Sequence, residues 1–385
     1  MNTAGAKKRI AIIGTGLIGG SLGLALKASA LQGLEIVGYD HDRSVATKAE
    51  KARALDRAEH SLGKAVAGAG MVIIAVPVLS VRDVMQQIAT DLEAGAVVTD
   101  TASTKAHVMQ WAEESLPKSV SFVGGHPMAG KETAGIEEAD GTLFRGRAYC
   151  VCPSVDASES AVKSVLGLAN TVGAEPLFID AAEHDIYAAA ISHLPLMIST
   201  ALFSMLRSSP AWPDMGMMAS SGFKDVTRLA SGNPAMSHGI WTTNREAVIH
   251  WLERMAAELQ RYRDMLTDAQ DETLLDTFAK AQIERDIFLS SPPQRERPDT
   301  SVKVDSGQAM LSMLVGGRFA EQIKRARQLP ELMKGAAKDA PKGDKRRLSF
   351  GDRVAEGIRE DLEKLEQKRA GKQDQPEEES RGKKT

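Results

Sequence analysis

The first 180 residues alternate between short, uniformly apolar runs and longer segments whose apolar residues recur at helical spacing. The apolar runs cover residues 9–14, 35–40, 71–76, 96–101 and 120–124, followed by 148–152 and 175–180. Buried strands without polar alternation, separated by helices, are typical of a parallel sheet covered on both faces. The pattern therefore predicts a Rossmann-type α/β domain over residues 1–180, with a doubly wound parallel sheet.

After residue 180 the strand pattern stops. Residues 181–208 form one long apolar segment of helical character, with a kink expected at Pro195. Residues 223–230 and 245–266 also have helical spacing. We therefore predict a separate all-α domain over residues 181–290. Its long apolar helices cannot bury all their surface in a small monomer, so we expect a homodimer.

Residues 291–385 are predicted to be a C-terminal extension dominated by charge of both signs. Pro292, Pro293 and Pro298 mark its start. An apolar stripe at helical spacing predicts an amphipathic helix over residues 350–368, and the tail after residue 373 has the composition of a disordered segment.

Composition limits the classes of function. The chain has a formal net charge of −3, which argues against a general nucleic-acid binder. Cys150 and Cys152 have no second pair with which to form a zinc site, so we expect no metal. The apolar run 11–26 is too short and too rich in glycine to span a bilayer comfortably. We expect a cytoplasmic protein that is not bound to a membrane.

A glycine signature follows the first predicted strand and opens a helix, in the segment Gly14-Thr15-Gly16-Leu17-Ile18-Gly19. In a dinucleotide-binding fold the first glycine permits a tight turn, the second lets the backbone approach a pyrophosphate, and the third allows close helix packing. The phosphates then lie at the N-terminus of the helix. The spacing alone is a weak signal.

Asp40 strengthens the signature, because it ends the second predicted strand 21 residues after Gly19. A carboxylate at that position accepts hydrogen bonds from the ribose hydroxyls and repels a 2′-phosphate, which favours NAD over NADP. Arg43 nearby weakens that preference. Val76 and Pro77 end another predicted strand, and we expect them to line the cofactor site.

His126 lies at the end of the fifth predicted strand, on the sheet edge where such folds bind ligands. A neutral imidazole beside a nicotinamide can accept the proton of a hydroxyl whose carbon loses a hydride. Ser103 follows the fourth strand at the same edge. Its hydroxyl could bond this imidazole or a substrate hydroxyl, or could cap the next helix.

Two further candidates lie in the predicted helical domain. His193 is a polar ring in an apolar helix, either a pocket residue or a core histidine. Asp225 and Arg228 share one helix face, and an arginine there suits bidentate capture of a substrate carboxylate. An ordinary surface pair is the alternative.

Together these motifs resemble the prephenate dehydrogenase family (the TyrA-type enzymes), in family order over roughly residues 8–270. The most specific matches are His126-Pro127-Met128-Ala129-Gly130 and Asp225-Val226-Thr227-Arg228, and the remaining matches are Gly14 to Ser21, Asp100 to Lys105 and Ser192-His193-Leu194-Pro195. The resemblance implies an NAD-dependent oxidative decarboxylation of prephenate to 4-hydroxyphenylpyruvate, in tyrosine biosynthesis, without a metal. We expect the helical domain over residues 181–290 to serve both substrate binding and dimerisation.

The resemblance also implies roles for individual residues. His126 would take the proton of the ring hydroxyl, and Ser103 would orient that histidine and the hydroxyl. Arg228 would bind a substrate carboxylate, and His193 would line the pocket near the side chain of the substrate. Glu132 and Asp225 would join Arg228 in an ionic network that controls access to the pocket.

The chain departs from the family pattern after Pro234, where Met236-Ser237-His238-Gly239 stands in place of a Met-Trp-x-Asp run. Three other functions stay open. An arogenate dehydrogenase would oxidise the amine counterpart of prephenate. A β-hydroxyacid-type dehydrogenase usually uses a lysine or a His-Glu pair. A non-enzymatic NAD-sensing module would have no use for His126 and Arg228.

Overall fold

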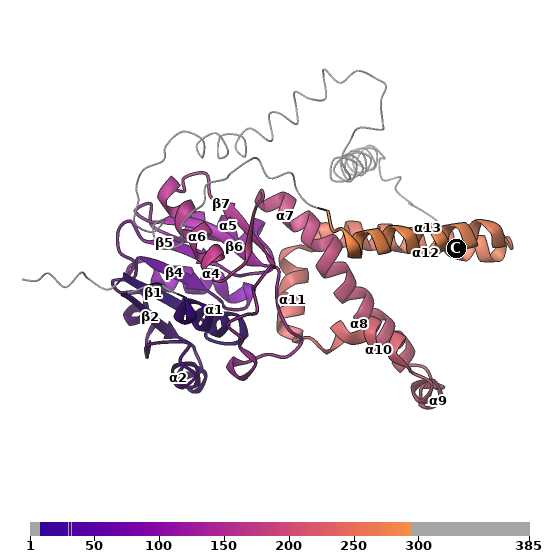
Figure 1. Cartoon of the computed structure of the whole chain (residues 1–385), viewed down its shortest axis with the longest axis horizontal. Coiled ribbons are helices and arrows are strands. Elements are labelled where there is room, and N and C mark those ends of the chain that lie inside the picture. Colours follow the sequence, from indigo (N-terminus) through magenta and orange to yellow (C-terminus); the bar gives the residue numbers. More distant parts are fainter. Residues whose placement is uncertain (1–7, 30, 32, 294–385) are drawn as a thin grey trace, which may run out of the picture. The chain divides into compact units, whose positions relative to one another are not determined.

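The alternating pattern folds into one eight-stranded sheet with the strand order β3-β2-β1-β4-β5-β6-β7-β8 (Figure 1). The chain runs outward from β1 to β3 and then returns to place β4 beside β1. The carboxyl ends of β1 and β4 therefore form the switch point where such sheets bind ligands. The strands are β1 (Lys8–Ile13), β2 (Leu34–Tyr39), β3 (Arg57–Ala58), β4 (Met71–Ile74), β5 (Val97–Asp100), β6 (Ser121–Pro127), β7 (Ala148–Pro153) and β8 (Glu175–Phe178).

The structure, a computed structural model, describes residues 8–29, 31 and 33–293. The described residues up to 269 belong to one compact unit, and helix α13 (Asp271–Ser290) belongs to a second unit. The amphipathic helix predicted over residues 350–368 and the predicted tail lie outside the described residues.

Helices cover both faces of the sheet, as the uniformly apolar strands predict. Ile10 and Ile12 of β1 belong to an apolar cluster with α1 (Leu17–Ala28), α2 (Arg43–Lys51) and α6 (Glu159–Thr171). The alternate residues Ala11 and Ile13 belong to the cluster on the other face. The helices of that face are α3 (Leu62–Val66), α4 (Val78–Ile88) and α5 (Ala106–Ser115).

The sheet is parallel from β3 to β6, and β7 then pairs antiparallel with β6. The connection between them contains only a short 3-10 turn, η1 (Ile136–Glu138), in place of a crossover helix. Without a crossover the chain reverses direction beside the strand that it has just left. β6 also extends beyond the predicted Gly124, so that His126 pairs with Cys150 inside the sheet.

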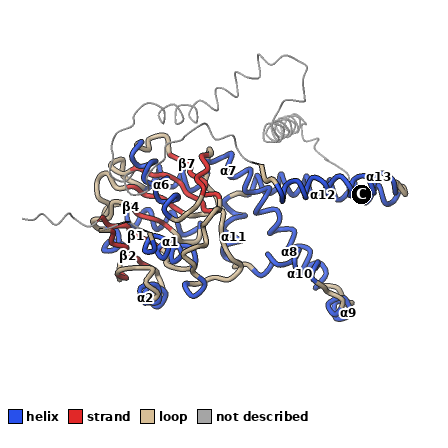
Figure 2. The backbone as a smooth tube through the Cα atoms, viewed as in Figure 1, coloured by secondary structure: helices blue, strands red, loops and turns tan. Residues whose placement is uncertain are grey.

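The segment after β8 is helical, and Figure 2 shows strands only before α7. Directly before Pro195, where a kink was expected, the helix widens into a π-turn and then continues as α8. Pro195 lacks the N–H that would bond the carbonyl of Ile191. The elements are α7 (Ala181–Ala188), the π-turn η2 (Ala189–His193), α8 (Leu194–Arg207), α9 (Trp212–Met217), α10 (Ser221–Thr227), the 3-10 turn η3 (Arg228–Ser231), α11 (Pro234–Thr243) and α12 (Arg245–Thr267).

The continuous run Ala181–Arg207 would be long and apolar enough to cross a membrane, judged by length and composition alone. Its polar side chains His184, Asp185 and His193 are nevertheless buried within the fold. Contacts of α7 with α5 and of α11 with α4 join this helical segment to the sheet. The run is therefore part of the folded unit that surrounds the candidate site.

Candidate active site

The glycine-rich turn between β1 and α1 has the shape of a dinucleotide cradle. Gly14 has a φ of 90°, and a side chain there would collide with the backbone carbonyl of Ala75. Gly16 stands at the N-cap of α1, and an added Cβ would meet no atom within 4 Å. The first turn of α1 carries no acidic residue. The turn thus offers open space and free helical N–H groups, which fits a bound pyrophosphate.

Asp40 lies directly beside this turn, at the end of β2. Its Oδ2 accepts a hydrogen bond of 2.8 Å from the backbone N–H of Thr15, and its Oδ1 accepts one of 3.1 Å from the N–H of Asp42. Val76 is half-buried after β4 and lies against Gly14, and Pro77 is exposed at the N-cap of α4. These residues place a fixed carboxylate and an apolar wall around the cradle, which fits the adenosine ribose of NAD.

His126 is 7% exposed and lies near the carboxyl end of β6. Its Nδ1 lies 2.8 Å from Nε2 of His184. Nδ1 of His184 in turn lies 2.8 Å from Oδ1 of the neighbouring Asp185. Both partners belong to α7, which begins directly after Asp180, whose side chain caps it. The fold therefore builds a buried chain of three polar side chains that ends on His126.

Asp185 also binds the N-terminus of α5. Its Oδ1 accepts the backbone N–H of Lys105 at 2.7 Å, and its Oδ2 accepts the N–H of Ala106 at 2.9 Å. These are donors without helical partners, and the positive end of the helix dipole favours a carboxylate there. Asp185 is thereby fixed as an acceptor at the base of the histidine chain.

A second buried pair fixes the backbone that precedes His126. Nζ of Lys105 forms an ion pair with Oδ2 of Asp100, and both side chains are fully buried. Asp100 also accepts the N–H of Ala102 at 2.8 Å and the N–H of Gly125 at 3.0 Å. The carboxylate of Asp100 therefore ties the end of β5 to the peptide next to His126.

His126 and His193 are both neutral at neutral pH. The pKa of His126 lies well below its usual value, because burial disfavours the charged ring and because His184, Lys105 and His193 lie nearby. Burial lowers the pKa of His193 to about 4. A neutral imidazole can accept a proton, as a general base must.

His193 is fully buried beside this chain. The side-chain amide of Asn244 donates to the carbonyl of Asp185 at 2.7 Å and lies 3.2 Å from Nδ1 of His193. Nε2 of His193 is buried and has no hydrogen-bond partner among the described residues. Such a nitrogen is free to bind a polar atom of a substrate.

Arg228, at the start of η3, forms an ion pair with Glu132. Both side chains are exposed, 58% and 36% respectively. Glu132 follows β6 by five residues, so this pair connects the helical segment with the loop that leaves His126. Among the described residues, Asp225 makes no ion pair and the hydroxyl of Ser103 makes no hydrogen bond to His126.

Five contributing residues were missed by sequence reasoning. Lys105 and Asp100 were noted only as parts of a motif, and Asn244 was not singled out. His184 and Asp185 lay within a segment interpreted only as an apolar helix. A histidine and an aspartate side by side in such a helix need buried partners, and that was the available signal.

Comparisons with known proteins agree with this geometry. A family profile described as "Prephenate dehydrogenase, nucleotide-binding domain" matches residues 22–177. A second, described as "Prephenate dehydrogenase, dimerization domain", matches residues 180–280. The prephenate dehydrogenase of Bacillus subtilis is 32% identical over 282 residues, covering 73% of this chain and 76% of that protein. The cyclohexadienyl dehydrogenase of Zymomonas mobilis is 29% identical over 278 residues, covering 71% and 94%.

Solved structures show the same architecture. The prephenate dehydrogenase from A. aeolicus, in complex with hydroxyphenyl propionate and NAD+, aligns with a TM-score of 0.68 at 27% identity, covering 74% of this chain and 99% of that one. Synechocystis arogenate dehydrogenase aligns with a TM-score of 0.62 at 26% identity, covering 73% and 99%.

Proposed function

Because the chain belongs to the prephenate dehydrogenase family, we propose that it catalyses the oxidative decarboxylation of prephenate to 4-hydroxyphenylpyruvate with NAD as the hydride acceptor. The observation that carries the proposal is the buried, neutral His126 near the carboxyl end of β6, in a fold with an open dinucleotide cradle. A coenzyme holder without chemistry would have no need of such a base.

His126 takes the proton of the ring hydroxyl while the carbon that bears this hydroxyl gives up a hydride. Bound NAD⁺ supplies the acceptor for that hydride. The bond from the ring to its carboxylate then breaks, and its electron pair completes the aromatic ring as carbon dioxide leaves. His126 returns the proton to the oxygen, which becomes the phenol of the product. The base is regenerated, and no metal is required.

Other residues hold the substrate. We propose that Arg228 binds a substrate carboxylate, in exchange for its ion pair with Glu132, and that Asp225 completes this ionic network at the pocket entrance. His193 offers its unpartnered Nε2 to the side chain of the substrate. Ser103, three residues after β5, orients the ring hydroxyl.

Coenzyme choice follows from Asp40. We propose that NAD binds with its pyrophosphate at Gly14 to Gly19, its ribose hydroxyls at Asp40, and its apolar contacts at Val76 and Pro77. The carboxylate of Asp40 repels the 2′-phosphate of NADP. Leu17 and Ile18 are half-buried in the first turn of α1, and Ile18 packs on the apolar cluster beneath the helix.

Arogenate is the alternative substrate. One relative is named a cyclohexadienyl dehydrogenase, and one aligned structure is an arogenate dehydrogenase. The two substrates differ only in a keto group or an amine on the side chain. We propose that His193 determines which of the two substrates is preferred. Its neutral ring can accept a hydrogen bond from an amine or donate one to a keto group without adding charge.

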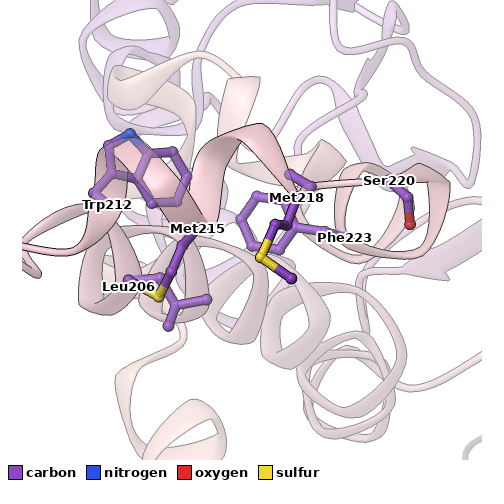
Figure 3. A pocket seen from close by; sticks show the side chains of 7 residues that line it. Leu206, Trp212, Met215, Met218, Ser220 and Phe223 are labelled. Carbon is purple, nitrogen blue, oxygen red and sulfur yellow. The ribbon is translucent and has the colours of Figure 1, made fainter.

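We further propose a homodimer formed by the helical domain. A pocket of about 230 Å³ opens between α8, α9 and α10 (Figure 3). Met218, which lines it, is 83% exposed, and the neighbouring Met217 is 87% exposed. Exposed apolar surface of this kind marks an interaction site, and the matching family domain is described as a dimerization domain. The pocket is lined by Leu206, Trp212, Met215, Met218, Ala219, Ser220 and Phe223.

We propose that the chain divides into a coenzyme domain (residues 1–180), a helical domain (residues 181–290) and a C-terminal extension (residues 291–385). We also propose that the protein is cytoplasmic and that its partners are small molecules and a second copy of the same chain.

One assay tests the function. Purified protein is mixed with NAD and either prephenate, arogenate or a 3-hydroxyacid, and NADH absorbance is followed. We expect NADH from at least one cyclohexadienyl substrate and none from the 3-hydroxyacid. A protein that binds NAD but oxidises neither cyclohexadienyl compound would refute the proposed activity.

A further inference from the structure

We propose that His184, held by Asp185, is a positioning residue that selects Nε2 of His126 as the catalytic base. The inference deepens the proposed function, since it assumes that His126 is the base. It assigns a task to His184 and Asp185, two buried side chains outside the coenzyme cradle and the Arg228–Glu132 ion pair.

The oxygens of the Asp185 carboxylate can only accept hydrogen bonds. They already bind two backbone N–H groups at the start of α5, so the carboxylate is held in place. Nδ1 of His184 lies 2.8 Å from Oδ1 of this carboxylate and must therefore carry a proton. A neutral imidazole carries only one proton, so Nε2 of His184 is left with a lone pair.

That lone pair faces Nδ1 of His126 at 2.8 Å. Two lone pairs at this distance would repel each other, so Nδ1 of His126 carries its proton and donates to His184. Nε2 of His126 then has no proton and is the only nitrogen of this ring that can accept one. The two rings meet edge to face, at 67° with centroids 5.1 Å apart, so the geometry of the bond is fixed.

Two variants separate positioning from packing. His184→Gln keeps a side-chain oxygen that accepts from His126, whereas His184→Leu fills similar space without an acceptor. We expect His184→Leu to lower kcat by about 10- to 100-fold, because a buried donor loses its partner. We expect His184→Gln to stay within about 5-fold of the natural enzyme. The dissociation constant for NAD should be unchanged in both, since the cradle lies on β1, β2 and β4.

The decisive readout is the tautomer itself. Nitrogen NMR of ¹⁵N-histidine protein distinguishes protonated from unprotonated ring nitrogens, and His126→Gln assigns the signal. We expect a protonated Nδ1 and an unprotonated Nε2 on His126 in the natural protein and in His184→Gln. A protonated Nε2 in the natural protein would overturn the inference, as would equal losses of kcat in His184→Gln and His184→Leu.

The NMR experiment does not need turnover, so it stays informative if the proposed substrate is wrong. Absence of NADH formation by the natural protein would remove the function and leave the tautomer measurement intact. Should His184→Leu fail to fold, the spectra of the natural protein and the kinetics of His184→Gln still decide the question.

Discussion

The buried Asp100–Lys105 ion pair predicts a specific pattern of stability. Lys105→Met removes the cation and replaces it with an apolar chain of similar length. The carboxylate of Asp100 then stays fully buried without its counter-charge, in a place where water cannot solvate it. The peptide next to His126 depends on that carboxylate, so the loss should also loosen the candidate site.

The magnitude follows from the contacts that remain. Breaking a buried ion pair by removing one partner costs about 3–5 kcal/mol. Asp100 keeps two backbone donors, from Ala102 and Gly125, so we expect a value near the lower end, about 3 kcal/mol. The double variant Asp100→Asn/Lys105→Met buries no charge. It should be more stable than Lys105→Met alone by about 1 kcal/mol or more.

Urea unfolding at one fixed protein concentration measures these differences, because the unfolding of an oligomer depends on concentration. Lys118→Met is the matched control. Lys118 pairs with Asp156 at 3.5 Å with both side chains over three-quarters exposed, so its loss should change the unfolding free energy by less than about 0.5 kcal/mol. Two results would refute this expectation. One is that the losses of unfolding free energy in Asp100→Asn and in Lys105→Met add up to the loss in the double variant. The other is that Lys105→Met loses no more unfolding free energy than Lys118→Met.

Three further predictions concern the coenzyme, the substrate and pH. Asp40→Ala should lower the preference for NAD over NADP by about tenfold or more, measured as the ratio of the two kcat/KM values; an unchanged ratio would place the ribose elsewhere. Arg228→Ala should raise the KM for prephenate by about 10- to 100-fold, whereas Lys224→Ala on the exposed face of α10 should leave it unchanged. His193 is held neutral with a pKa of about 4, against 6.5 for an unburied ring, so unfolded chains bind a proton that the folded protein excludes. The unfolding free energy should therefore fall as pH is lowered from 6.5 to about 4, and the fall should be smaller in His193→Gln.

The parallel part of the sheet could be predicted because each strand is apolar on both faces. Ile10 and Ile12 pack on one helical layer while Ala11 and Ile13 pack on the other. The reversal at β7 could not be predicted in the same way. Its strand is as apolar as the others, and its direction depends on a connection that carries only a 3-10 turn.

The candidate site was predicted in part for a similar reason. Glycine spacing, Asp40 and His126 follow from local rules about strand ends and helix starts. The partners of His126 depend on tertiary contacts, because His184 lies 58 residues further along the chain and meets it only after α7 docks beside α5. Arg228 and Glu132 form an ion pair, and the roles of Arg228, Glu132, Asp225 and Ser103 in binding the substrate remain predictions.

The most direct test of the account compares the natural protein with His126→Asn, measuring NADH formation from prephenate beside the dissociation constant for NAD. Asparagine can still donate from the position of Nδ1 to His184, but it offers no basic nitrogen to the substrate. We predict that turnover falls by ~10²–10⁴ while NAD affinity changes less than about twofold. Turnover within tenfold of the natural rate, or a parallel loss of NAD binding, would contradict the assignment of His126 as the base.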